Sequence, residues 1–231
     1  MNKVLSVLKL YFTETYKRLL LVLLFMTVAD LGLYFLRIAE VSSFSELINQ
    51  CHVSLIFALG CILMVLGNML QKNKVSRYAY TYQRLRISER SAFLLQCLAY
   101  TVNLIAVYLY QLMLIYVLYR LYMPLGYESA VNVFAEFMSN STLMVLVPMF
   151  TNKQWLITPV MLILGGICSA SRAVRQRYDK WDFGTPALVQ FIVNLNKIRN
   201  YEYILVVLFA VLVVSASFVL ALQLTHDGKR R

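Results

Sequence analysis

The sequence predicts an all-α polytopic membrane protein, folded as one membrane domain over residues 1–231. Three observations predict this class. First, 60% of the 231 residues are hydrophobic and 14% are charged, whereas an ordinary soluble domain is about 25% charged. Second, the apolar residues gather in runs of about 20, the length at which a helix crosses the hydrocarbon of a bilayer. Third, the basic residues, whose excess gives a net charge of +11, lie mostly between these runs.

Six such runs are predicted as transmembrane helices. Each run has one charged residue or none. The predicted spans are 19–36, 53–70, 91–119, 131–150, 154–171 and 203–224.

The first span is preceded by a basic segment with an apolar face. Val4, Leu8, Tyr11, Phe12 and Leu19 fall near one side of a helix, opposite lysines. This pattern predicts an N-terminal amphipathic helix in the membrane interface; the alternative is an ordinary basic flank of the first span. The first span is longer than a signal-peptide core, and no small-residue cleavage site follows it, so we expect it to remain as an anchor.

The distribution of Lys and Arg predicts the orientation. Residues 1–18 contain four, the segment 71–92 contains six, and the loop 37–52 between them contains one. Because positively charged segments stay in the cytoplasm, the N-terminus and segment 71–92 are expected inside, and six spans return the C-terminus to the same side. Anionic lipid therefore explains the basic excess better than nucleic acid, and the lipid bilayer is an expected partner.

The number of spans stays open between six and five. Six spans place 14 Lys and Arg inside and 8 outside, whereas five, with 131–150 not crossing, place 16 inside and 6 outside. The charge rule thus leans slightly toward five, and run 131–150 is the most polar of the six. A second short helix is predicted at 185–199, between the last two spans, because Thr185-Pro186 is a helix-start signal before an apolar stripe.

No motif for catalysis or for metal binding is visible. His52 and His226 cannot pair within one span, and Cys51, Cys61, Cys97 and Cys168 show no C-x-x-C spacing. Hydrolase, zinc-protease, P-loop and potassium-filter motifs are absent from the sequence. We therefore expect no enzyme, no catalytic residue, and no cofactor or metal site in this chain.

Polar residues inside the predicted spans are the remaining candidates. Charged groups are costly in hydrocarbon and are expected to face protein or water. Two interpretations are open, a polar path for a substrate and hydrogen bonds between helices, the latter worth about 0.6 kcal/mol each. On the third span Gln96, Tyr100, Asn103, Val107 and Gln111 share one helical face. The candidate residues are Asp30, Gln96, Asn103, Gln111 and Glu136.

The segment YQRLRISER at 82–90 resembles the cytoplasmic connection between the second and third spans of ABC-type exporter permeases of the type V fold. That family has a short R-L-x-(I/V)-S-(R/E) run that leads directly into the third span, although it often has proline where this chain has Arg86. The wider plan is similar too: an amphipathic N-terminal helix, six spans in about 230 residues, and an outer helical segment between spans five and six, here 172–202. This last likeness favours six spans. The matching residues are Arg84, Leu85, Ile87, Ser88, Glu89 and Arg90, and together with Arg86 they form the segment that the resemblance implies for coupling.

The resemblance implies a permease subunit in a bacterial cytoplasmic membrane. Segment 71–92 would then carry a coupling helix that docks on a separate ABC ATPase subunit, which binds the ATP, and a second permease copy or a paralogue would complete the pathway. Ser88 would cap the helix that enters the third span, and Glu89 would favour its N-terminal dipole. The alternative function is a non-transporting membrane scaffold, sensor or immunity protein without an ATPase, in which the arginines are only positive-inside anchors.

Overall fold

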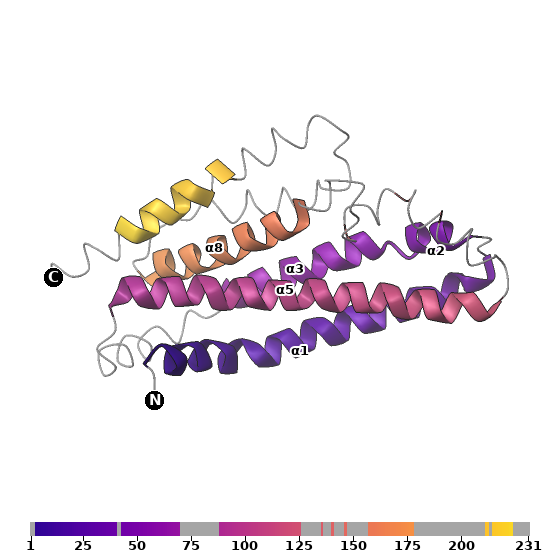
Figure 1. The fold of residues 1–231 in the computed structure, drawn as a ribbon, viewed down its shortest axis with the longest axis horizontal. Helices are drawn as coiled ribbons and strands as arrows, with labels where there is room; N and C mark the ends of the chain where they lie inside the picture. Colours follow the sequence, from indigo (N-terminus) through magenta and orange to yellow (C-terminus); the bar gives the residue numbers. More distant parts are fainter. Residues whose placement is uncertain are drawn as a thin grey trace.

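The computed structural model describes residues 3–40, 43–69, 88–125, 157–177, 211–212 and 214–223, with the single positions 135, 140 and 146. Every regular element in this part is helical, which confirms the all-α prediction for it (Figure 1). Three helices are long and apolar enough to cross a membrane: Val4–Arg37, Phe44–Gly67 and Glu89–Tyr122. Most of the predicted span 131–150, segment 71–87 and region 178–210 lie outside the described residues.

The main helices form an elongated bundle. They are α1 (Lys3–Arg37), α2 (Phe44–Gln50), α3 (Val53–Met69), α5 (Glu89–Tyr122) and α8 (Ile157–Arg177). Single 3-10 turns at Ile38–Glu40 and Met123–Leu125 follow α1 and α5, and a short apolar helix covers Val214–Gln223.

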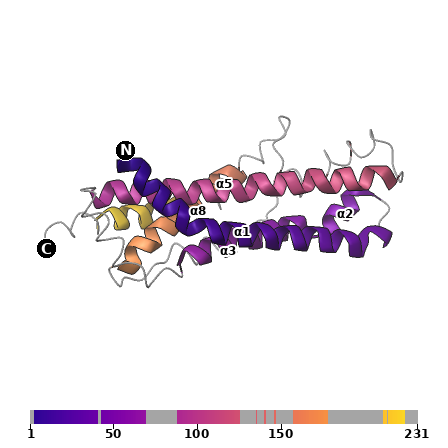
Figure 2. The same cartoon turned by 90° about the horizontal axis from the view of Figure 1, so that it is seen from below.

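The N-terminal segment, predicted as an amphipathic helix, is helical and continuous with the first span. Residues 3–37 form one helix, whose first part is inclined to the remainder (Figure 2). The Thr13 and Thr15 hydroxyls donate to the carbonyls of Lys9 and Tyr11, at 2.7 and 3.0 Å, and such bonds to the preceding turn often bend helices. The apolar face of this part packs on α5, because Tyr11 lies buried in a cluster with Ala92 and Ala99.

Helix α5 runs parallel to α1, and α3 runs antiparallel to both. Thr15 and Asp30 of α1 bond to Asn103 and Gln111 of α5, so their numbers rise together. Arg18 of α1 donates to the carbonyl of Gly67 in α3, and Met26, farther along α1, lies against Gly60, earlier in α3, so the residue numbers of these two helices change in opposite directions. This is the up-down-up order of three successive membrane crossings.

Helix α8 packs along α5 in the opposite direction. Gly166 lies against the Thr101 backbone, whereas Ala170 and Val174 cluster with Phe93, near the start of α5. The end of α8 therefore lies at the same end of the bundle as the starts of α1 and α5 (Figure 1). Six spans in the predicted order would make 154–171 parallel to the third span, so the direction of α8 is the one that the five-span alternative requires.

The last helix also runs toward this end of the bundle. Figure 1 shows Val214–Gln223 running in the same direction as α8, and its Phe218 and Ala221 join the cluster of Phe93 and Val174. The five-span alternative would make this helix parallel to α5, so the described part follows neither predicted order throughout.

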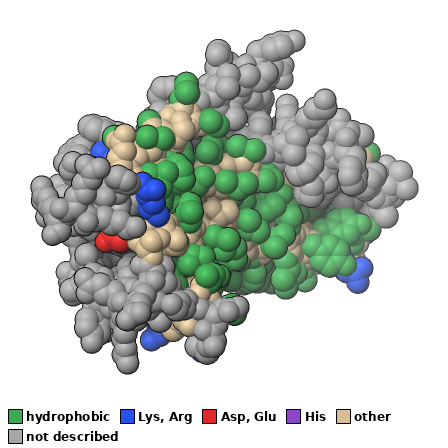
Figure 3. Space-filling model, turned by 60° about the vertical axis from the view of Figure 1, so that its left-hand side comes forward, with side chains coloured by type: hydrophobic (Ala, Val, Ile, Leu, Met, Phe, Trp, Pro, Cys, Tyr) green, Lys and Arg blue, Asp and Glu red, His purple; other side chains and the backbone are tan. Residues whose placement is uncertain are grey.

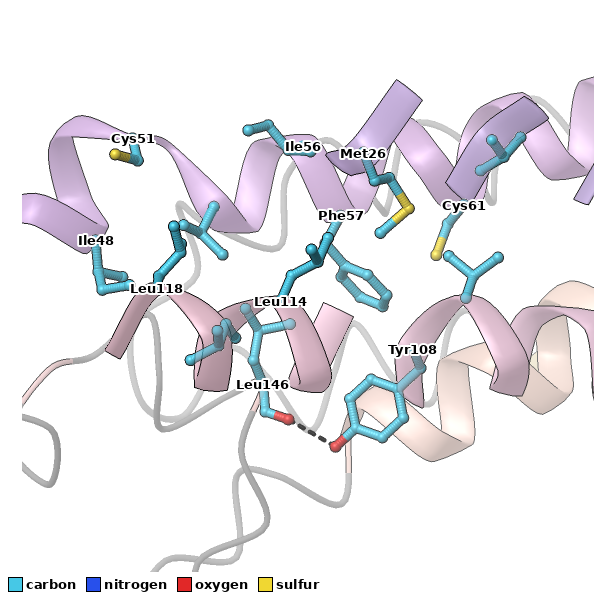
Figure 4. Packing of buried hydrophobic residues seen from close by; sticks show 14 of the residues in the cluster. Met26, Ile48, Cys51, Ile56, Phe57, Cys61, Tyr108, Leu114, Leu118 and Leu146 are labelled. Carbon is cyan, nitrogen blue, oxygen red and sulfur yellow. Dashed lines mark hydrogen bonds between the residues drawn. The ribbon is translucent and has the colours of Figure 1, made fainter. Parts of the chain in front are cut away.

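The largest apolar core lies between α1, α2, α3 and α5 (Figure 4). Met26, Phe57 and Leu114 come from three of these helices and fill its centre. Outside, hydrophobic side chains form a continuous area, with few basic or acidic ones beside it (Figure 3). A large exposed apolar surface of this kind is unfavourable in water and suits contact with lipid. On α1 and α5 it includes Leu20, Leu24, Val28, Leu94, Leu98, Val102, Leu109 and Met113.

Candidate functional site

The polar face of α5 points into the bundle. Gln96, Asn103 and Gln111 are at most 3% exposed, and Tyr100 and Val107 are fully buried beside them. Their spacing of three and four residues keeps them on one side of the helix. Gln96 donates to the Tyr100 hydroxyl at 2.8 Å within α5 itself, whereas Asn103 and Gln111 donate to side chains of α1.

Asn103 joins α5 to α1. Its Nδ2 atom donates to the Thr15 hydroxyl at 2.8 Å, and both side chains are buried. The Thr15 hydroxyl in turn donates to the Tyr11 carbonyl of its own helix. Each group is therefore satisfied by a neighbour instead of by water, as buried polar groups require.

Two more polar contacts join the same helices farther along. The Thr27 and Tyr110 hydroxyls lie 2.6 Å apart, and Gln111 Nε2 donates to Asp30 Oδ2 at 2.8 Å. Together with the Thr15–Asn103 bond they form a row of three contacts, which we call the α1–α5 polar row. Of the candidate intramembrane residues, Asp30, Asn103 and Gln111 thus join α1 to α5.

A polar pocket of about 760 Å³ lies at the other end of the bundle, around α2. The Ser43 hydroxyl caps α2 by accepting from the Glu46 amide at 3.2 Å, and Asn140 Nδ2 donates to the Ser45 hydroxyl at 2.8 Å. The S-x-x-E spacing of Ser43 and Glu46 is a known helix-start signal that could have revealed this short helix from the sequence. The pocket itself depends on tertiary packing. It is lined by Arg37, Ser43, Ser45, Glu46, Asn49, Gln50 and His52.

The cap predicted at the start of the third span is confirmed. Ser88 precedes α5 with an extended backbone, its hydroxyl accepts from the Ser91 amide at 3.2 Å, and Glu89 lies in the first turn. Glu89 and Arg90 are exposed. The other proposed coupling residues, Arg84 to Ile87, lie outside the described residues, and so does Glu136.

The described residues offer no group of three or more His, Cys, Asp or Glu side chains that could hold a metal ion. Cys51, Cys61, Cys97 and Cys168 are all buried and form no disulfide with one another; the last three lie in helices, where a buried cysteine behaves as a small apolar residue. Comparison of this chain with models of protein families, with curated proteins and with solved structures found no match.

Proposed function

We propose that this chain is the transmembrane permease subunit of an ATP-driven ABC exporter in a bacterial cytoplasmic membrane. The residue-level support is the resemblance of 82–90 to the coupling connection of such permeases. The observation that carries the proposal furthest is the position of α5. This helix begins at Glu89, directly after the Ser88 cap and inside the segment of resemblance, and continues unbroken for 34 residues.

Helix α5 is suited to carry motion from one side of a membrane to the other. It packs against the other long helices described, α1, α3 and α8, and most extensively against α8 and α1. At 1.5 Å per residue its length is about 51 Å, well above the hydrocarbon thickness of about 30 Å. Docking of segment 71–92 on an ATPase would act directly on the capped end of this rod. In this proposal the ATPase subunit binds the ATP. A second permease copy or a paralogue would complete the transport pathway.

A second candidate is a membrane scaffold, sensor or immunity protein without an ATPase. The observation that favours it is the α1–α5 polar row, whose side chains bond to each other between the two helices. In this alternative the basic residues of 71–92 serve only to fix the orientation in the membrane.

Co-purification of an ATPase from the native host separates the two candidates. If 82–90 docks on an ATPase, the double change Leu85→Asp and Ile87→Asp should abolish co-purification, because it puts unpaired charges into a protein contact. The matched control, Lys72→Gln with Lys74→Gln, should retain it, because lysines that only face lipid headgroups contribute about 1 kcal/mol each to membrane attachment.

Both variants are compared at equal levels of inserted permease. Retention of the ATPase by the Leu85/Ile87 variant, or no ATPase with the wild-type chain, would contradict the transport proposal and favour the scaffold.

A further inference from the structure

Asp30 and Gln111 form the most deeply buried contact of the α1–α5 polar row. Both side chains are 0% exposed, and one hydrogen bond of 2.8 Å joins Gln111 Nε2 to Asp30 Oδ2. This bond leaves one oxygen on each side chain. Asp30 Oδ1 and Gln111 Oε1 are both buried without a hydrogen-bond partner in the part of the chain that the structure describes. A buried polar atom of this kind calls for an explanation.

The surroundings of Asp30 provide no counter-charge among the described residues. The Cys51 thiol, at the end of α2, is close enough to interact electrostatically with Asp30. The same thiol also interacts electrostatically with Arg37, at the end of α1. From α5, the Tyr110 hydroxyl is engaged with Thr27. No Lys, Arg or His of the described part pairs with Asp30 itself. An ionised carboxylate would therefore be buried without a cation, which is strongly unfavourable.

We propose that Asp30 and Gln111 form a proton-binding site inside the bundle. Asp30 is protonated on Oδ1, and this O–H group donates a hydrogen bond to Gln111 Oε1. Gln111 Nε2 donates a second hydrogen bond to Asp30 Oδ2. A carboxylic acid and a primary amide have the complementary donors and acceptors for two such bonds side by side. The single proton satisfies both remaining oxygens and removes the buried charge. This inference does not depend on the proposed transport function.

In this arrangement, close packing of α1 against α5 depends on the protonation of Asp30. Loss of the proton would leave a carboxylate oxygen beside an amide oxygen, with no donor between two acceptors. The helices would have to separate or admit water to relieve it, because a buried unpaired charge is costly.

Infrared difference spectroscopy of the protein in lipid vesicles at neutral pH tests the proposal. The wild type minus Asp30→Asn spectrum should contain the C=O band of a protonated carboxyl, and this band should shift in deuterium oxide. Gln111→Leu should keep the band but move it to higher frequency, because the carboxyl loses its partner. The control Asn103→Leu removes another buried amide of the same row and should leave the band in place.

Asp30→Asn should fold, because an asparagine amide can make both bonds to Gln111. Failure of this variant to fold, or a difference spectrum with carboxylate bands instead of the acid band, would overturn the proposal. Repeating the spectra in choline chloride with and without sodium chloride tests for a cation site: the acid band should be the same in both, and a band that sodium abolishes would assign the two oxygens to a metal cation.

Discussion

At the scale of single residues, close approach of α5 and α8 depends on one missing side chain. A Cβ atom added to Gly166 would lie 2.7 Å from the backbone nitrogen of Thr101 and 2.8 Å from its Cα atom. Backbone atoms inside a helix cannot turn aside as a side chain can. At Gly32 of α1, by contrast, an added Cβ would meet nothing within 4 Å.

Gly166→Ala should therefore lower the free energy of unfolding by about 1–3 kcal/mol, the usual cost of overpacking. Gly32→Ala is the matched control and should leave stability equal or slightly higher, since alanine favours a helix over glycine by about 1 kcal/mol in water. Unfolding in detergent micelles measures both. Equal stability of the two variants would mean that α5 and α8 do not pack this closely.

At the scale of helices, the α1–α5 polar row fixes how these two parallel helices pair. Hydrogen bonds inside a membrane are modest individually, since the unfolded state also finds partners there. The geometry of the row nevertheless opposes sliding, because a shift along the axis would break its three contacts together.

A double-mutant cycle with Thr15→Val and Asn103→Leu should give a coupling energy of about 0.6 kcal/mol in the free energy of unfolding. Thr15→Val with Gln96→Leu serves as the comparison and should be additive, because Gln96 donates to Tyr100 of its own helix and lies about two turns of α5 away from Asn103, the partner of Thr15. A vanishing Thr15–Asn103 coupling would show that the two side chains do not meet in the membrane.

Local patterns in the sequence were sufficient to predict helices α3 and α5 and the polar face of α5. They did not predict which residues of other helices contact that face. Helix α3 covers Val53–Met69 where 53–70 was predicted, and α5 covers Glu89–Tyr122 where 91–119 was predicted, because apolar runs determine helices in hydrocarbon. The partner of Asp30 could not be predicted, since a bond over 81 residues of chain depends on how α1 and α5 align.

At the scale of the whole molecule, three helix ends meet at one end of the bundle. The starts of α1 and α5 and the end of α8 lie there, and the end of α1 lies at the other (Figure 1). The six-span order would have placed 172–202 opposite the N-terminus. The periodicity of a helix carries no information on its direction, and the charge counts for five and six spans differed too little to determine it.

Cysteine labelling tests this arrangement after Cys51, Cys61, Cys97 and Cys168 have been replaced by alanine. Lys9→Cys and Arg172→Cys should react with a membrane-impermeant thiol reagent from the same side of sealed vesicles, and Arg37→Cys from the opposite side. Reaction of the cysteines at positions 9 and 172 from opposite sides would restore the six-span order for α8.

The exposed stripe of α5 also determines how the bundle responds to bilayer thickness. Its outward-facing apolar side chains continue from Leu94 to Leu121, a distance of about 40 Å at 1.5 Å per residue. Such a stripe exceeds the hydrocarbon of about 30 Å, and a helix in this position tilts or thickens the lipid around it. Because Asn103 and Gln111 tie α5 to α1 at separate points, the two helices should tilt together. Lipids with shorter chains should therefore incline the bundle as one body instead of sliding one helix past the other.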